Sequence, residues 1–205
     1  LLENSFCRYH ISQISSAKTV EVVRKNKNSG KKFSCGVSIN NLSLNENDIG
    51  DFRTFLKLSP PLRTEEDRLS LIKGLNDSTI DNIVSDHKPE DEESKRLTFA
   101  KAATGASGIE TLLPLALELY HNKLVSLKTI ISSLTVNPAK ILGLDKGHLK
   151  TGANADLSIV DINKPWIVKK EKLISKSKNT SIENRKLQGQ VLRTYIKGDL
   201  LFNRS

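Results

Sequence analysis

Short apolar runs alternate along the first half of the chain with longer stretches in which apolar residues recur every three or four positions. Four of the apolar runs end at turn-forming residues and are predicted to be strands: residues 6–12, 33–38, 55–58 and 80–85. Two stretches that follow Ser or Thr, which commonly cap helices, are predicted to be helices: residues 17–28 and 64–73. Strands and helices in this order predict a parallel sheet with crossover helices.

The pattern changes in the second half of the chain. After a long charged loop at residues 88–104, three amphipathic stretches are predicted to be helices: residues 109–121, 126–133 and 138–142. Gly147 and Gly152 interrupt the periodicity. Beyond them, alternation predicts three strands, the last two forming a hairpin: residues 155–161, 190–196 and 200–202. We therefore predict one domain at residues 1–147 and a second, smaller β domain at residues 148–205.

Charge and hydropathy exclude two classes of partner. The chain has 205 residues and a formal net charge of +9, most of it in residues 148–205. These basic residues alternate with apolar ones and lack aromatic neighbours on which bases could stack, so we expect an acidic protein partner or a solvated face, and no nucleic acid. No apolar run reaches the roughly 18 residues that a membrane span requires, so we expect no membrane association.

The cysteine content fits a cytoplasmic protein. Cys7 and Cys35 are too few to form a disulfide framework, and we expect both to be reduced thiols. The sequence contains no methionine. Because an intact gene product normally starts with one, we interpret the chain as the C-terminal part of a longer protein.

Asp86 is the leading candidate for chemistry. It follows an apolar run at residues 80–84, which is how a barrel strand brings a carboxylate to its catalytic rim. Together with the segments around it, this stretch resembles the C-terminal half of a class I dihydroorotase of the amidohydrolase superfamily. The motifs that carry the resemblance are Ser59-Pro-Pro-Leu-Arg63, Asp77-Ser-Thr-Ile-Asp81, Ser85-Asp86-His87, Gly108-Ile-Glu-Thr111, Thr135-Val-Asn-Pro-Ala139, Gly152-Ala-Asn-Ala-Asp156 and Ser175-Lys-Ser-Lys-Asn-Thr180.

The resemblance implies an α/β fold, the eight-stranded (β/α)8 TIM-type barrel with a composite β-sandwich. Residues 1–147 would supply barrel strands five to eight with their helices, and residues 148–205 would supply part of the sandwich. The first expected partner is the N-terminal half of the same barrel. Because four strands alone leave two open edges, we also expect oligomers.

The family's zinc site is only partly matched. The resemblance places the fifth-strand histidine at Gln13, the sixth-strand histidine at Asn40 and the eighth-strand acid at Asp86, which alone is retained. Amide side chains are poor zinc donors compared with imidazole, so we expect this chain not to bind zinc. Asp86 would then be either a metal ligand and general base or a relic acid held by loop hydrogen bonds.

The family's substrate contacts are also altered. The resemblance places Arg63 near the substrate, Ser59 at a substrate-binding asparagine, and Glu90 at the second histidine of an Asp-His-Ala-Pro-His motif. Arg63 could instead form a salt bridge with a nearby acid. Glu90 could belong to a solvated acidic loop, to a docking surface or to a mobile lid. We interpret His10 and His87 as structural histidines.

Two functions compete at this point. The first is a catalytically degenerate member of the dihydroorotase family in pyrimidine biosynthesis, a scaffold or partner subunit of aspartate carbamoyltransferase; some degenerate members resemble residues 37–40 and 45–50 closely. The second is an active zinc dihydroorotase that interconverts carbamoyl-aspartate and dihydroorotate when the N-terminal half is present. A decaying gene without function is a third possibility. The lost histidines favour the degenerate protein.

Overall fold

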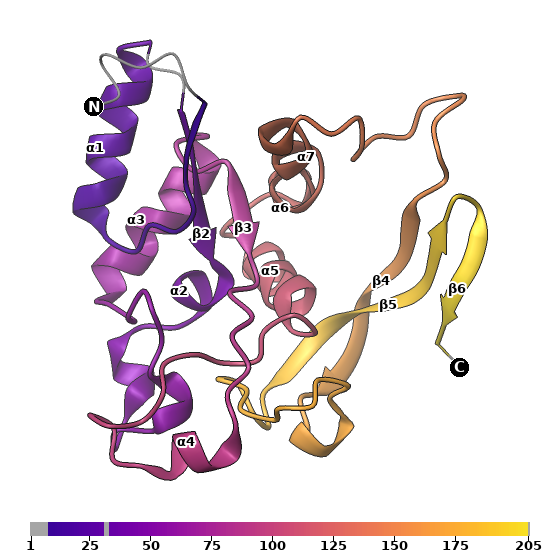
Figure 1. Cartoon of the computed structure of the whole chain (residues 1–205). Coiled ribbons are helices and arrows are strands. Elements are labelled where there is room, and N and C mark those ends of the chain that lie inside the picture. Colours follow the sequence, from indigo (N-terminus) through magenta and orange to yellow (C-terminus); the bar gives the residue numbers. More distant parts are fainter. Residues whose placement is uncertain (1–7, 31–32, 205) are drawn as a thin grey trace.

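A parallel three-stranded sheet lies at the centre of the N-terminal part of the molecule (Figure 1). The computed structural model describes residues 8–30 and 33–204, so the predictions for Phe6 and Cys7 lie outside the described residues. The strands lie side by side in the order β1 (Tyr9–Ile11), β2 (Phe33–Ser38) and β3 (Asn82–Val84). Both strand pairs are parallel, as the alternation of strands and helices predicts.

Helices cover the sheet on both sides in Figure 1. On one side α1 (Ala17–Asn28) contacts α3 (Glu65–Asn76). On the other side lie three helices, α5 (Leu112–His121), α6 (Leu127–Leu134) and α7 (Val136–Leu142). Two further helices are a single turn or little more, α2 (Ile39–Ser43) and α4 (Glu92–Arg96).

Local sequence explains where the longer helices begin. The Ser16 hydroxyl accepts a hydrogen bond from the Thr19 amide at the start of α1, and the Thr64 hydroxyl accepts one from the Asp67 amide at the start of α3. Val20 and Val23 then bury the apolar face of α1. These caps confirm the predicted start of the first helix and place that of the second within one residue.

The strand predicted at residues 55–58 is wrong. This segment forms a 3₁₀ turn, Thr54–Leu56, and β2 instead pairs directly with β3. Leu56 and Leu58 are both buried, so the apolar residues reflect a chain that crosses the core in irregular conformation. The pair Pro60-Pro61 follows at once and cannot donate backbone hydrogen bonds to a neighbouring strand.

Two other boundaries differ from the prediction. Helix α3 continues through Gly74 to Asn76. Gly74 is a packing position within the helix, because a Cβ there would lie only 3.0 Å from Ile80 Cδ1. The predicted loop at residues 88–104 contains the short helix α4, whose start Asp91 caps by accepting a hydrogen bond from the Ser94 amide.

The C-terminal part is an antiparallel sheet of β4 (Leu157–Ile167), β5 (Lys186–Ile196) and β6 (Asp199–Asn203). The predicted hairpin is present as β5 and β6, and the predicted strand at 155–161 is longer and continues to Ile167. Figure 1 shows this sheet extending away from the helices as an arm, while the chain between β4 and β5 returns to the main body.

One hydrophobic core joins the two parts of the chain. It includes Val37 of β2 and Leu115 of α5 together with Val168, Leu173 and Ile182 from the segment between β4 and β5. Cys35, also in this core, is a free thiol, and burial raises its pKa to about 11. Among the described residues, no helix is long and apolar enough to cross a membrane.

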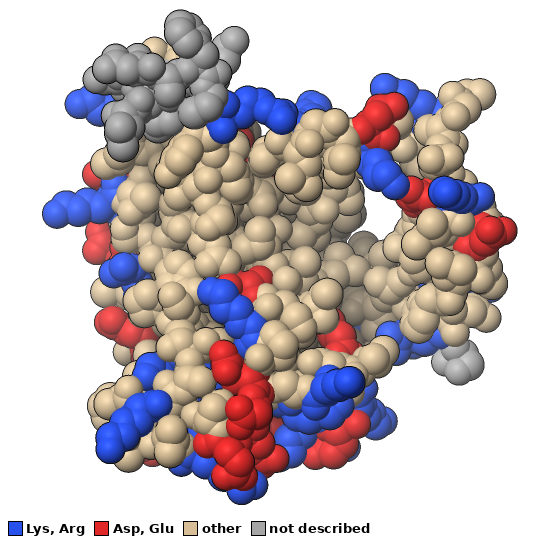
Figure 2. Space-filling model, viewed as in Figure 1, with Lys and Arg blue, Asp and Glu red and all other residues tan. Residues whose placement is uncertain are grey.

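Acidic and basic side chains lie next to one another in the lower part of Figure 2. Arg96 of α4 forms ion pairs with Glu92 and Glu93 of the same helix, at 3.0 and 2.6 Å. The charges of this region are therefore partly neutralised within the chain.

Candidate functional site

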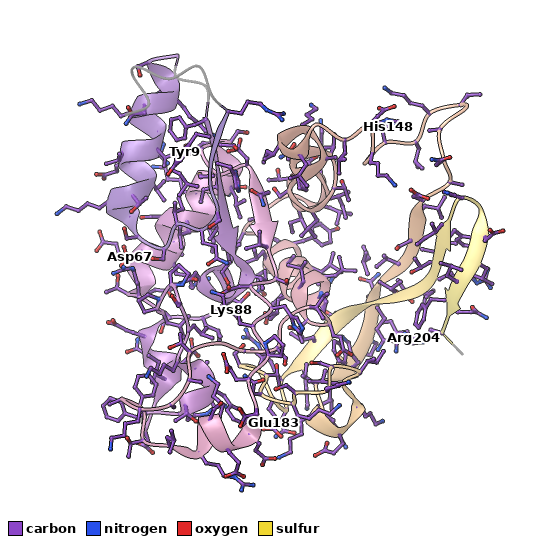
Figure 3. All side chains as sticks on the ribbon, in the orientation of Figure 1. Tyr9, Asp67, Lys88, His148, Glu183 and Arg204 are labelled. Carbon is purple, nitrogen blue, oxygen red and sulfur yellow. The ribbon has the colours of Figure 1, made fainter. Side chains whose placement is uncertain are left out.

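Three polar side chains lie where the parallel strands end. Ser38 is the last residue of β2, while Gln13 and Asp86 each follow two residues after the ends of β1 and β3. Because parallel strands deliver their carboxyl ends to one edge of a sheet, the three side chains meet there. Lys88, which follows Asp86, lies at this edge in Figure 3.

Asp86 is the centre of this cluster. Its side chain is 3% exposed. Its Oδ1 accepts a hydrogen bond of 2.8 Å from Gln13 Nε2 and forms an ion pair with Lys88 Nζ at 3.0 Å. Its Oδ2 accepts a longer hydrogen bond of 3.4 Å from the Ser38 hydroxyl. The carboxylate is thus held by three side chains from three separate segments.

The backbone at Asp86 has an uncommon conformation. Its φ is 48°, in the left-handed region that residues other than glycine enter at some cost. Aspartate tolerates this region better than most residues, because its short side chain can form local hydrogen bonds. Strained residues of this kind concentrate at functional sites, which agrees with the position of Asp86 at the sheet edge.

Lys88 connects Asp86 to the motif that carries the predicted substrate residues. Its ammonium donates a second hydrogen bond, of 2.8 Å, to the backbone oxygen of Ser59. Ser59 therefore contributes to the site through its main chain.

Asn40 joins this cluster only through its backbone, whose amide donates to the Ser38 hydroxyl at 3.3 Å. It is buried, and its Oδ1 accepts a hydrogen bond of 2.9 Å from the Ser181 hydroxyl, 141 residues away in the chain. Its Nδ2 has no hydrogen-bond partner among the described residues. The structure brings Gln13 and Asp86 into contact and directs Asn40 toward the segment between β4 and β5.

Arg63 and Glu90 make their hydrogen bonds to groups outside the Asp86 cluster. Arg63 is exposed, and its Nε donates to the Ser15 hydroxyl at 2.9 Å. The salt bridge considered for Arg63 is absent from the described part of the chain, where Glu65 instead pairs with Arg68 at 2.6 Å.

The Glu90 loop is bound to the segment between β4 and β5. The Glu90 amide donates to Asn179 Oδ1 at 3.2 Å, and the Glu90 carbonyl accepts a hydrogen bond from the Ser177 hydroxyl. The motif at residues 175–180 therefore holds the loop that follows Asp86. These contacts argue against a freely mobile lid.

His10 and His87 are hydrogen-bonded outside the Asp86 cluster. His87 Nδ1 accepts hydrogen bonds from the amides of Gly108 and Ile109, at 3.1 and 3.3 Å. His10 Nδ1 lies 2.7 Å from the Ser34 hydroxyl, and burial lowers the pKa of its imidazole. Both contacts are those of structural histidines.

A cavity of about 940 Å³ adjoins the sheet edge. Acidic residues of the loop at 89–92 line one wall, and the segments 170–171 and 175–179, which contain three lysines, line the other. The residues that line this cavity include His87, Glu90 and Asn179. Asp86 does not line it.

The residues at the sheet edge do not fit a metal ion. Within residues 8–30 and 33–204, no group of three or more His, Cys, Asp or Glu side chains is arranged so that it could hold a metal ion. A carboxylate can only accept hydrogen bonds, so Gln13 must direct its NH₂ group, and not its oxygen, at Asp86. Lys88 adds a positive charge at the same oxygen, where a cation ligand site needs a negative one.

Sequence reasoning missed two members of the cluster, Lys88 and Ser38. The signal for Lys88 was present in the sequence, because it occupies the position of the small alanine in the Asp-His-Ala-Pro-His motif. A long cation beside a retained acid predicts an ion pair. Ser38 gave no such signal, since a hydroxyl at the end of a strand is common.

Comparisons with known proteins agree on one family. Residues 6–201 match the model of the amidohydrolase family. The chain is 44% identical over 190 residues to a dihydroorotase of Ehrlichia canis, covering 93% of this chain and 42% of that protein. It is also 44% identical over 194 residues to a dihydroorotase of Anaplasma phagocytophilum, covering 95% of this chain and 43% of that protein.

Solved structures show the same fold. An L-hydantoinase from Arthrobacter aurescens superposes with a TM-score of 0.92 at 27% identity, covering 98% of this chain and 46% of that one. A dihydropyrimidinase from Brevibacillus agri gives a TM-score of 0.87 at 21% identity, covering 95% of this chain and 44% of that one, and this likeness shows the fold alone. The chain spans less than half the length of these relatives. It has a mixed α/β fold and belongs to the amidohydrolase family, in which it is dihydroorotase-like.

Proposed function

We propose that this chain is part of a catalytically degenerate dihydroorotase-family protein of pyrimidine biosynthesis, which serves as a scaffold or partner subunit of aspartate carbamoyltransferase. The observation that carries the proposal is the set of contacts that the Asp86 carboxylate makes. Its carboxylate is buried and holds an amide and an ammonium on the same oxygen, where a catalytic acid of this family would face a metal.

The architecture is part of the proposal. Residues 1–147 would form the C-terminal half of a (β/α)8 barrel, and residues 148–205 part of a β-sandwich. Support comes from the parallel order β1-β2-β3 and from the superposition on 46% of an L-hydantoinase. The N-terminal half of the barrel would then pair with the open edges of β1 and β3. A cytoplasmic location is consistent with the free, buried thiol of Cys35.

The cluster explains why hydrolysis would fail. A hydrolytic zinc supplies two effects, a water with a pKa near 7 and a polarised carbonyl, and both require ligands that donate electron pairs. The Gln13 side chain directs its N–H group at Asp86 as a hydrogen-bond donor, and the Asn40 amide oxygen accepts a hydrogen bond from Ser181. Asp86, already accepting three hydrogen bonds, has no activated water to deprotonate.

The alternative is an active dihydroorotase. Asp86 is retained at the end of a barrel-type strand, and curated relatives named dihydroorotase share 36–44% identity with this chain. Activity would require ligands from the part of the protein beyond this chain.

Metal content and turnover of the intact protein decide between the two. The protein is incubated with zinc, freed of excess metal, and assayed for bound zinc and for dihydroorotate hydrolysis. We expect less than stoichiometric zinc and no turnover above that of an Asp86→Ala variant. Stoichiometric zinc with turnover that Asp86→Ala abolishes would overturn the degenerate function in favour of the enzyme.

The proposed partner requires a separate experiment. Purified aspartate carbamoyltransferase from the same organism is mixed with the intact protein and analysed by size-exclusion chromatography with light scattering. We expect a complex of defined mass. Separate elution of the two proteins at micromolar concentration would contradict the partner role, whatever the outcome of the metal assay.

A further inference from the structure

We propose that the ammonium of Lys88 is a built-in counter-ion that takes the place of the metal charge at Asp86 and keeps divalent cations out of the site. This inference rests on the proposed loss of metal binding and adds the residue that compensates for it. With this arrangement, the residues at the carboxyl ends of the parallel strands would keep their structure without a bound metal ion.

The burial of Asp86 requires a compensating charge. A carboxylate that is 3% exposed has lost most of its hydration, and an ionised group in that position is costly unless it is paired and hydrogen-bonded. Gln13 and Ser38 provide neutral donors only. Among the described residues, Lys88 is the one cation paired with Asp86, at 3.0 Å.

The position of Lys88 also prevents a metal from binding. Its Nζ lies between Asp86 Oδ1 and the Ser59 carbonyl, at 3.0 and 2.8 Å. A divalent cation that used Oδ1 would have to displace this ammonium or lie beside it, and two like charges at such a distance repel strongly in a partly buried site. The side chain of Lys88 is 45% exposed, so its stem reaches inward from the surface to place the charge.

Lys88 has the reach that the site needs. It lies two residues beyond Asp86, in a loop that is itself held by Asn179 through the Glu90 amide. The alanine that the dihydroorotase motif has at this position carries no charge and could not reach the carboxylate. A single substitution thus supplies both the charge and the length.

A double-mutant cycle tests the ion pair. The intact protein is prepared with Lys88→Ala, with Asp86→Asn and with both changes, and thermal midpoints are measured in the presence of a chelator. We expect Lys88→Ala to lower the midpoint by roughly 3–6 °C, because a buried carboxylate is left without its counter-ion. Adding Asp86→Asn should recover a large part of that loss. Asparagine also tolerates the left-handed backbone at this position.

An exposed pair provides the matched control. Lys146 and Asp156 lie 2.6 Å apart, but their side chains are 59% and 26% exposed. Changes at this pair should shift the midpoint by no more than about 1–2 °C. Additive effects at positions 86 and 88, or a loss no larger than in the control, would overturn the counter-ion role.

A second experiment tests the exclusion of metal. Gln13→His is prepared, once with Lys88 retained and once with Lys88→Ala, and zinc affinity is measured by competition with a chromogenic chelator after circular dichroism has confirmed folding. We expect at least tenfold tighter zinc binding without Lys88. Equal affinity in the two variants, including no measurable binding by either, would overturn the exclusion.

Failure of this inference and failure of the proposed function are distinguishable. Zinc-dependent turnover by the unmodified protein would overturn the proposed function. Additive effects in the cycle, in a protein without turnover, would overturn only the role of Lys88.

Discussion

Gln13, Asp86 and Lys88 show how far residue-by-residue reasoning reaches. The sequence predicted that Gln13 and Asp86 share one site, and the structure joins them with a hydrogen bond of 2.8 Å. It also placed the Asn40 side chain in that site, but only the Asn40 backbone contacts the cluster, through Ser38, while its side-chain oxygen accepts a hydrogen bond from Ser181. The difference arises because side-chain direction at the end of a strand depends on which distant segment covers it, and no local pattern encodes that segment.

Glu65 provides a prediction for pH at the same scale. Hydrogen bonds from Arg68 and then from Asn45 lower the pKa of its carboxyl from 4.5 to about 2. A carboxyl with a lowered pKa in the folded state contributes stability above pH 4.5 and loses it as the pH falls toward 2. Glu65 is 45% exposed, so Glu65→Gln should cost only about 0.5–1 kcal/mol at pH 7.

Urea unfolding at pH 7, 4 and 2.5 measures this effect. The difference between Glu65→Gln and the unmodified protein should shrink steadily as the pH falls. Glu66→Gln is the control, since Glu66 lies in the same helical turn and forms no ion pair in the described part of the chain. A difference independent of pH, or equal for both variants, would contradict the prediction.

At the scale of elements, capped and periodic segments are predicted well. The bounds of α1 and β2 agree with the prediction, because a capping serine and an apolar run with clear ends are local signals. The segment at 55–58 was predicted wrongly for a physical reason. Burial alone is enough to produce an apolar run. The backbone hydrogen bonds to a neighbouring strand, which define a strand, cannot be recognised in a sequence of four residues.

Helix α4 carries the second prediction. Lys95 is buried, and its ammonium donates to the carbonyls of Thr54 and Ala103, at 3.1 and 2.8 Å. It thereby joins α4 to the 3₁₀ turn and to the end of the loop. Burial lowers the pKa of this lysine, and the nearby Glu90 raises it. Lys95→Met keeps the length of the side chain but removes both hydrogen bonds, so the loop should open more often.

Limited proteolysis with a glutamate-specific protease measures the opening, because Glu90, Glu92 and Glu93 lie in this loop. We expect cleavage at least threefold faster in Lys95→Met than in the unmodified protein. Lys101→Met is the control, since Lys101 is exposed in the same loop. Equal cleavage rates in all three proteins would show that Lys95 does not hold the loop.

For the whole molecule, the fold class followed from the sequence but the long-range connections did not. The alternation of strands and helices predicted the parallel sheet, and the seven motifs indicated the family. The contacts of Ser181 with Asn40 and of Asn179 with the Glu90 loop could not be predicted from local patterns, because they join segments about 90 to 140 residues apart. The domain boundary at residue 147 remains a prediction. The hydrophobic core contains residues from both sides of this position.

The open edges of the parallel sheet lead to the third prediction. In the described part of the chain, β1 and β3 each pair with one strand only, and β2 lies between them. Unpaired edges of apolar strands associate with other chains. We therefore expect residues 1–205 alone to form oligomers, as light scattering after size exclusion would show.

A charged edge provides the control for association. Tyr9 of β1 is 47% exposed, and Tyr9→Lys should reduce the average mass, because lysine on an edge strand opposes pairing. A monomer with a sharp, reversible thermal transition would contradict the predicted association.

The hydrogen bond between Asn40 and Ser181 has a consequence for synthesis in the cell. A ribosome delivers the chain from its N-terminus at about 5–20 residues per second, so Asn40 waits roughly ten seconds or more for its partner. During that interval its amide and the apolar residues around it lack the segment that later covers them. Nascent chains stalled before residue 181 should therefore recruit holdase chaperones, and synthesis of the segment that contains Ser181 should end that dependence.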